Sequence, residues 1–177
     1  HQHDYNHIHY NIISPVGHRV NCEWVSKKLS DDVAPEILGV FAQIGDRYRQ
    51  AAPGEQLAER PVEFLVEALD RKTGSVFPQQ PAVIQIHFSN GTAKVWNFKY
   101  ALEDEAGTPP KISDVYKFDF LDSAGVKRVT QGDQEGVRMF FRLQVPEGAE
   151  GDFEISAEDF AGNRTVFRGS LPLNSSK

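Results

Sequence analysis

Residues 151–173 read GDFEISAEDFAGNRTVFRGSLPL and decide the fold class. Two runs alternate apolar and polar residues around a polar turn that contains Gly162 and Asn163. In the first run Phe153, Ile155 and Ala157 share one face, because successive side chains of a strand point to opposite sides. The pattern predicts a half-buried antiparallel hairpin. It specifies architecture and says almost nothing about chemistry.

A second hairpin is predicted upstream, where residues 82–88 and 92–100 alternate on either side of Ser89-Asn90-Gly91. Asn-Gly between alternating runs is a strong hairpin signal, and we expect positive φ at both turn residues. The faces expected to meet a core carry Ile84, Ile86 and Phe88 on one strand and Trp96, Phe98 and Tyr100 on the other. Further strands are predicted at 112–120, 126–130 and 137–145, and short strands at this spacing favour an antiparallel β-sandwich.

A small two-helix subdomain is predicted at residues 30–74. Ser30, Asp31 and Asp32 have the short oxygen-bearing side chains that cap a helix, and Pro61 is placed to begin a second helix over 61–72. Apolar residues then recur at three- and four-residue spacing, which is the helical period. They are Val33, Ile37, Phe41, Ile44 and Tyr48 in the first helix, and Val62, Leu65, Val66 and Leu69 in the second.

The chain is expected to form one elaborated domain over 1–177, with a His-rich segment at 1–29, the helical part at 30–74 and the β-sandwich at 82–173. The alternative boundary lies near 103–110, EDEAGTPP, where charge, glycine and a double proline coincide. One domain is preferred because 177 residues can bury one sizeable core and residues 1–80 are short of apolar material for their own.

Charge and composition exclude two classes of partner. The 19 Lys and Arg are interspersed among 25 Asp and Glu, for a formal net charge of −6. This lacks the clustered positive patch that phosphate backbones require, so we expect no nucleic acid. No apolar run approaches the roughly 20 residues that span a bilayer, so no transmembrane segment is expected. Cys22 is the single cysteine and is interpreted as a small buried side chain.

Two segments carry a resemblance to a known family. They are 113–129, with the turn Asp122-Ser123-Ala124-Gly125-Val126, and 153–163, FEISAEDFAGN. They resemble the last strands of bacterial immunoglobulin-like domains, which often close on an Ala-x-Asp-x-Ala-Gly-Asn turn. The resemblance implies a β-sandwich module of a secreted, periplasmic or cell-surface protein, and it carries over no catalytic residue.

Four of the six histidines lie in the first nine residues, as His1, His3, His7 and His9. In an extended segment residues two apart leave on one face, so all four would project together. Imidazole is a strong ligand for Cu and Zn, and His18 or His87 could complete the shell. The alternative interpretation is a terminal segment that binds metal only adventitiously.

If His1 begins the mature chain, its amine and imidazole resemble the histidine brace of copper-dependent polysaccharide monooxygenases and of some periplasmic copper carriers. That resemblance implies a copper site. Acidic residues near the C-terminal turn suggest a calcium loop only weakly, because the spacing of Asp152, Glu158 and Asp159 fits no oxygen-ligand motif. Asp159 is better interpreted as a turn former that accepts nearby backbone amides.

Three functions follow from these patterns. The first is a non-enzymatic extracytoplasmic protein whose N-terminal histidines bind Cu or Zn. The second is a metal-free binding or assembly module of a larger secreted or surface protein, with a protein or carbohydrate partner. The third is a copper- or zinc-dependent enzyme that uses the same histidines.

Overall fold

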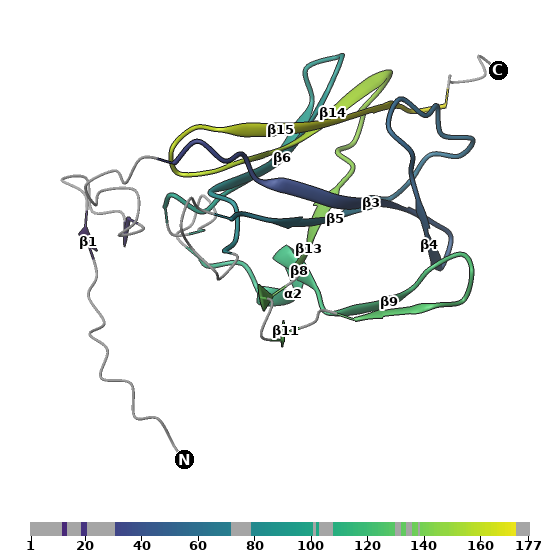
Figure 1. Cartoon of the computed structure of the whole chain (residues 1–177). Helices are drawn as coiled ribbons and strands as arrows, with labels where there is room; N and C mark the ends of the chain where they lie inside the picture. Colours follow the sequence, from purple (N-terminus) through teal and green to yellow (C-terminus); the bar gives the residue numbers. More distant parts are fainter. Residues whose placement is uncertain are drawn as a thin grey trace.

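The computed structural model describes residues 12–13, 19–20, 31–71, 79–100, 102, 108–129, 132–133, 136–137 and 139–172. These residues are arranged mainly in antiparallel strands, as Figure 1 shows. Two larger sheets hold the core between them. In the described residues the one helix is α2, Ile112–Val115.

The first sheet has five strands in the order β4-β3-β5-β13-β8. Their bounds are β3 Glu36–Ile44, β4 Arg47–Gln50, β5 Glu63–Leu69, β8 Tyr116–Lys117 and β13 Met139–Gln144. Every pairing is antiparallel, and β5 lies in the centre between β3 and β13. A register shift between Ile37 and Gly39 marks a bulge in β3.

The second sheet has four strands in the order β15-β14-β6-β7. Their bounds are β6 Val83–Phe88, β7 Ala93–Asn97, β14 Asp152–Glu158 and β15 Arg164–Ser170. The hairpins β6–β7 and β14–β15 pair through β6 and β14, so that β7 and β15 form the two edges. Short two-stranded ladders make up the rest: β1 Ile12–Ile13 with β2 Arg19–Val20, β9 Asp119–Leu121 with β10 Lys127–Val129, and β11 Gly132–Asp133 with β12 Gly136–Val137.

The two larger sheets pack against each other over a shared apolar core. The β5 ring of Phe64 lies 4.8 Å from the β14 ring of Phe153, centroid to centroid, and both residues are buried. Ile84 and Ile86 of β6 are fully buried in the same cluster, as the alternation along that strand predicts. Aromatic pairs at such spacing add about 1 kcal/mol beyond the area they bury.

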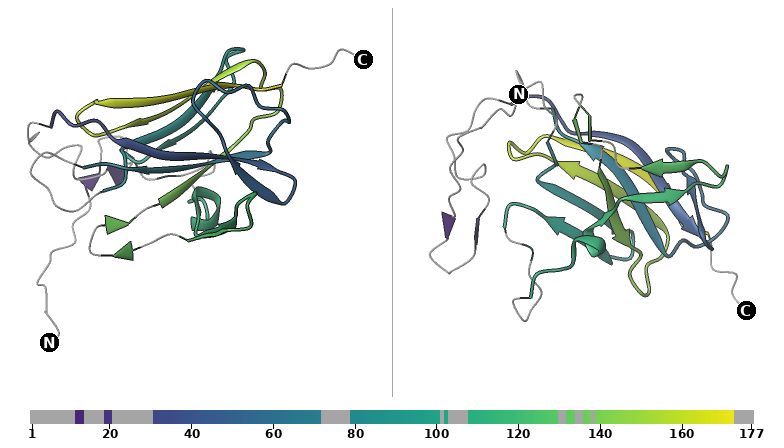
Figure 2. Two further views of the ribbon diagram at one scale, coloured as in Figure 1. Left: turned by 45° about the vertical axis from the view of Figure 1, so that its right-hand side comes forward. Right: turned by 90° about the horizontal axis from the view of Figure 1, so that it is seen from below.

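The hairpin β9–β10 packs on part of the other face of the five-stranded sheet. Its Phe120 contacts the rings of Phe41, Tyr48 and Phe140 at centroid distances of 5.2, 4.9 and 5.0 Å. These residues and Leu65 form a second buried cluster. The central strands therefore lie between two layers, as the views in Figures 1 and 2 show.

The predicted two-helix subdomain is wrong, because residues 36–50 and 63–69 form the strands β3, β4 and β5. The physical reason is burial on both faces. In β5 every residue except Glu67 is buried, so the alternation typical of a half-buried strand is lost. A continuous apolar run of this kind also contains helically spaced apolar residues, and periodicity alone does not separate the two structures.

The hairpin predictions are confirmed in position and corrected in turn geometry. Gly91 has φ +88°, but in the described residues positive φ is confined to glycines, so Asn90 does not adopt it. Gly91 N–H donates to the Phe88 carbonyl, and Phe88 N–H donates to the Thr92 carbonyl. This is a three-residue loop that ends in a left-handed glycine, instead of the expected two-residue turn. Among the described residues, no helix has the length and apolar character that crossing a bilayer would need.

Candidate functional site

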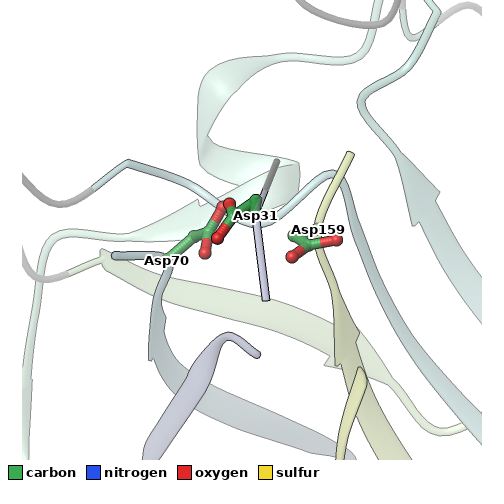
Figure 3. A group of neighbouring side chains, drawn as sticks. All are labelled: Asp31, Asp70 and Asp159. Carbon is green, nitrogen blue, oxygen red and sulfur yellow. The ribbon is translucent and has the colours of Figure 1, made fainter. Parts of the chain in front are cut away.

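Three aspartates from distant parts of the chain converge at one end of the two-sheet core. They are Asp31 before β3, Asp70 just after β5 and Asp159 just after β14. One carboxylate oxygen from each lies within 4.8 Å of the others, and Asp70 and Asp159 are 0% exposed. Figure 3 shows the three side chains approaching from separate segments.

Asp159 also organises the turn between β14 and β15. Its Oδ1 accepts hydrogen bonds from the backbone amides of Gly162 at 2.6 Å and Asn163 at 2.8 Å. The Asn163 side chain donates to Asp159 Oδ2 and also to the Asp31 carbonyl oxygen. The prediction that Asp159 is a turn former is therefore confirmed, and Asn163 links the turn to the segment before β3.

Hard cations such as Ca²⁺ prefer oxygen ligands, and Ca²⁺ takes six to eight of them from carboxylates, carbonyl groups and water. Three carboxylates alone do not define such a site. Glu158, which the sequence weakly suggested as a calcium ligand together with Asp159, does not join the aspartate group. Its carboxylate forms an ion pair with Lys99 at 2.7 Å. The approach of Asp31 and Asp70 had no signal in the sequence, since both residues are brought there by pairing of distant strands.

Of the six predicted histidine ligands, the described residues include His87 alone. His1, His3, His7, His9 and His18 lie outside the described residues. His87 is exposed on the outer face of β6, where its Nε2 lies 3.1 Å from Gln85 Oε1. Within the described part of the chain the metal-ligating groups of three or more comprise the aspartate group alone, and His87 does not belong to it.

A concave surface follows the β7 edge of the four-stranded sheet, and we call it the edge groove. Its volume is about 760 Å³, against about 560 Å³ for a hollow beside His87. It runs along four consecutive residues of β7 and is closed on the other side by the segment that leads into α2. Its lining residues are Lys94, Val95, Trp96, Asn97, Tyr100, Leu102, Thr108, Pro109, Pro110, Lys111, Asp114 and Gln144.

Trp96 is held in a fixed orientation at the floor of the edge groove. Its indole Nε1 donates to the Arg142 carbonyl on the facing sheet at 2.6 Å. The Lys94 ammonium lies over the ring, 3.9 Å from its centroid. A partly buried cation–π contact of this kind contributes about 1 kcal/mol. The floor is therefore an amphipathic platform whose indole ring is held by a hydrogen bond and a cation–π contact.

Beneath this platform a buried polar network secures Arg142. Its Nε donates to Glu63 Oε2 at 2.9 Å, and one of its terminal nitrogens donates to the Ser113 carbonyl in α2 at 2.6 Å. The Tyr48 hydroxyl donates to the other oxygen of Glu63 at 2.5 Å. Burial, followed by the hydrogen bond to Glu63, raises the pKa of Tyr48 well above its usual range. Tyr48 therefore stays a neutral donor across physiological pH.

Among the described residues that line the edge groove, the net charge is opposite in sign to that of the chain. The charged lining residues of the groove are Lys94, Lys111 and Asp114, a net +1, whereas the whole chain carries −6. Asp114 accepts the backbone amide of Lys111 at 3.1 Å and so caps the start of α2. A ligand with negative charge meets a locally favourable potential here.

Sequence patterns indicated part of this site and missed its character. Trp96 and Tyr100 were predicted to face a core together with Phe98. Phe98 is 7% exposed and belongs to the core, and Trp96 packs against that core while it also lines the groove. Tyr100 is 38% exposed and lines the groove without belonging to the core. Pro109 and Pro110, at the end of the segment 103–110 given as the alternative domain boundary, line the groove. Two prolines after a strand predict a turn, but the sequence does not show which surface these prolines contact.

Comparison of the chain with family models, with curated proteins and with solved structures found no significant match in any of the three.

Proposed function

We propose that this protein is a non-enzymatic binding module and that it holds its partner in the edge groove. The observation that carries the proposal is the ordered platform of Trp96, fixed to the facing sheet and bordered by Tyr100 and two prolines. Concave surfaces that combine aromatic side chains with a few oriented polar groups are the usual binding sites of proteins. Here they lie on the edge of a rigid sheet, so little order has to be created on binding.

Strand order supports an immunoglobulin-like sandwich as the scaffold. In chain order, β3, β5, β6, β7, β8, β13, β14 and β15 take the places of strands A, B, C, C′, D, E, F and G. The order β3-β5-β13-β8 is then A-B-E-D, and β15-β14-β6-β7 is G-F-C-C′. With the resemblance of residues 153–163 to bacterial immunoglobulin-like domains, this order favours a module that works outside the cytoplasm as part of a secreted, periplasmic or surface protein.

A direct test is an unbiased ligand screen with the site mapped by NMR. The ¹⁵N-labelled protein is offered a displayed random-peptide library and a panel of soluble glycans, and each ligand found is titrated while amide shifts are followed. We expect the shifts to concentrate at residues 94–97, 108–111 and 144. Ligands that shift only the outer sheet face around His87 and Arg168, or a screen in which nothing shifts the groove, would contradict the proposal.

The N-terminal histidines support a second function, transition-metal binding, through their two His-x-His pairs. Cu²⁺ or Zn²⁺ added to protein without an affinity tag should bind with fixed stoichiometry at pH 7 and lose affinity below about pH 6, as the imidazoles protonate. Calorimetry on a variant that combines His3→Ala with His7→Ala measures the effect. Unchanged affinity in that variant would exclude His3 and His7 as ligands and would contradict a site built from the two His-x-His pairs.

A further inference from the structure

We infer that the partner in the edge groove is an extended peptide with acidic residues, which adds to the four-stranded sheet as a strand beside β7. This inference rests on the proposed function and specifies its ligand. Two properties of the described structure carry it: the backbone of β7 offers open hydrogen-bonding groups, and the other sheet edges are closed or very short.

Three of the four edges of the larger sheets are protected. Beyond β15, the amide of Gly54 donates to the Arg168 carbonyl, and the Ser170 amide donates to Glu55. Beyond β4, the amide of Ser123 donates to the Tyr48 carbonyl at 2.8 Å. The edge strand β8 is two residues long. Covering loops and very short edge strands are common ways to prevent unwanted strand pairing.

The edge at β7 has neither form of protection in the described part of the chain. The strand is five residues long, and its ladder with β6 alternates regularly. Phe88 bonds to Thr92 and Phe98 to Ala82, so the bonded pairs of this antiparallel ladder include residues 94 and 96 of β7. The N–H and C=O groups of Ala93, Val95 and Asn97 therefore point away from β6, toward the groove side.

The side chains of β7 favour a peptide strand with uncharged residues on one face and aromatic or acidic residues on the other. The outward-facing set, Ala93, Val95 and Asn97, carries no charge and would lie beside small or β-branched residues of the peptide. Peptide residues on the other face would lie level with Lys94 and Trp96, where an aromatic side chain can stack and a carboxylate can reach an ammonium. A second copy of β7 is penalised in the register that places Lys94 opposite its own equivalent, because like charges directly opposite each other are destabilising.

The probe is the acetylated and amidated peptide Thr-Glu-Thr-Phe-Thr-Glu-Thr, with a matched peptide that carries Lys in place of both Glu. The Glu and Phe side chains share one face of the extended peptide, and the Thr side chains share the other. Binding to wild-type protein is followed by NMR titration and by amide hydrogen exchange. We expect the Lys peptide to bind about tenfold or more weakly, because opposite charges across an interface are favoured and like charges are penalised.

Hydrogen exchange gives the most specific readout. In the free protein the amides of Lys94 and Trp96 should already exchange slowly, and those of Ala93, Val95 and Asn97 should exchange fast. At a peptide concentration ten times Kd the second set should slow by about tenfold, since only bound molecules protect it. This measurement uses the wild-type chain and does not depend on a variant that folds.

A matched pair of variants tests the backbone contact. Val95→Pro removes an N–H that does not belong to the β6–β7 ladder, so the sheet is retained and the added strand loses a donor. Val95→Thr keeps the N–H and the branched shape. We expect Val95→Pro to raise the Kd of the Glu peptide at least about tenfold. We expect Val95→Thr to change that Kd by less than about twofold.

The outcomes separate this inference from the proposed function. Groove shifts without protection of Ala93, Val95 and Asn97, or a glycan that binds the groove while neither peptide does, would overturn strand addition and leave the binding module standing. If neither peptide shifts the groove and the ligand screen finds nothing there, both are overturned. Protection of the three amides with loss of binding in Val95→Pro supports both.

Discussion

The two edges of the four-stranded sheet differ in whether another part of the described chain covers them. At β15 the chain folds back over its own edge, so that Gly54, Glu55 and Leu57 form backbone hydrogen bonds with Arg168 and Ser170. At β7 the described chain forms no such cover, and the edge is bordered by a groove of about 760 Å³. Both strands belong to the same sheet and share the same core.

The difference shows which edge serves stability and which is available for recognition. An open edge of a sheet is a template for pairing with another chain, and folded proteins usually blunt it. Here the same sheet protects β15 with its own backbone and leaves the outward groups of β7 beside an aromatic platform. The two edges should therefore respond differently to substitution and to pH.

The largest effect is expected at the turn that closes the hairpin bearing the protected edge. Asp159→Ala removes a fully buried side chain that accepts two backbone amides and an Asn163 amide, and leaves those donors unsatisfied. We expect a loss of about 3 kcal/mol in the free energy of unfolding, measured by urea denaturation. The control is Asp119→Ala, which breaks an exposed ion pair with Lys127 and should cost less than about 1 kcal/mol. Equal losses of unfolding free energy in the two variants would contradict the role of Asp159 in holding the turn.

A slightly smaller effect is expected for Gly169→Ala, within the protected strand itself. A Cβ at this position would lie 2.6 Å from the Phe153 ring and 3.0 Å from the Glu55 carbonyl, so both the core and the covering loop resist it. Overpacking of this kind costs about 2 kcal/mol. The matched change at the open edge, Val95→Ala, removes a side chain that is 42% exposed and should cost less than about 1 kcal/mol. Thermal unfolding of the two variants compares the edges directly, and a tolerated Gly169→Ala would contradict the close approach.

Acid should loosen the protected edges. The Ala52 amide, followed by Arg49, lowers the pKa of Glu55 in the loop over β15. Beyond β4, the Val126 amide, followed by Arg128, lowers the pKa of Asp122. A carboxyl whose pKa is lower in the folded state contributes stability above its unfolded pKa, and this contribution is lost as pH falls through the folded pKa. The stabilising contributions of Glu55 and Asp122 are therefore lost as the pH falls below the ordinary pKa values of 4.5 and 3.8, respectively.

Hydrogen exchange between pH 3 and pH 6 checks the acid effect. After correction for intrinsic rates, the Ser170 amide should lose protection below about pH 4.5. Glu55→Gln should reduce that protection already at pH 6, whereas Glu147→Gln, at an exposed turn position, should not. Protection of Ser170 that is independent of pH in the wild-type protein would show that Glu55 does not hold the covering loop.

The smallest effect on stability is expected at the open edge. Val95→Lys places a charge on an exposed outward position of β7, so the free energy of unfolding should change by less than about 0.5 kcal/mol. Its effect should appear in peptide binding instead, because a second ammonium beside Lys94 penalises a partner of like charge. The Lys peptide should bind more weakly relative to the Glu peptide than it does in the wild-type protein. A large loss of stability would mean that Val95 is packed against the chain and that the β7 edge is not open.

Sequence patterns could predict the strands that have one buried face. Residues 83–88, 93–97, 139–144, 152–158 and 164–170 form strands as their alternation indicated, and Asp159 with Gly162 and Asn163 forms the turn that the motif predicted. The resemblance to bacterial immunoglobulin-like domains came from this half of the chain. The strands that the proposed scaffold assignment uses extend over 36–170, well beyond the residues that carried the resemblance.

Residues 36–50 and 63–69 could not be assigned in the same way. Phe41 and Leu65 face the layer formed by β9 and β10, and Val40 and Val66 face the four-stranded sheet. Strands buried on both faces carry apolar residues at consecutive positions, and these include helical spacings by chance. Only the packing of a third layer on the sheet distinguishes them from helices.

By itself, the sequence determined the β-rich class, the main hairpins and the histidine-rich N-terminus, because these depend on local alternation, turn residues and composition. Only the tertiary structure decided that β5 is central, that Asp31, Asp70 and Asp159 meet, and that Trp96 and Pro110 border one groove. The physical reason is that these features join residues far apart in the chain. Their proximity depends on which strands pair and which faces pack, and no local pattern contains that information.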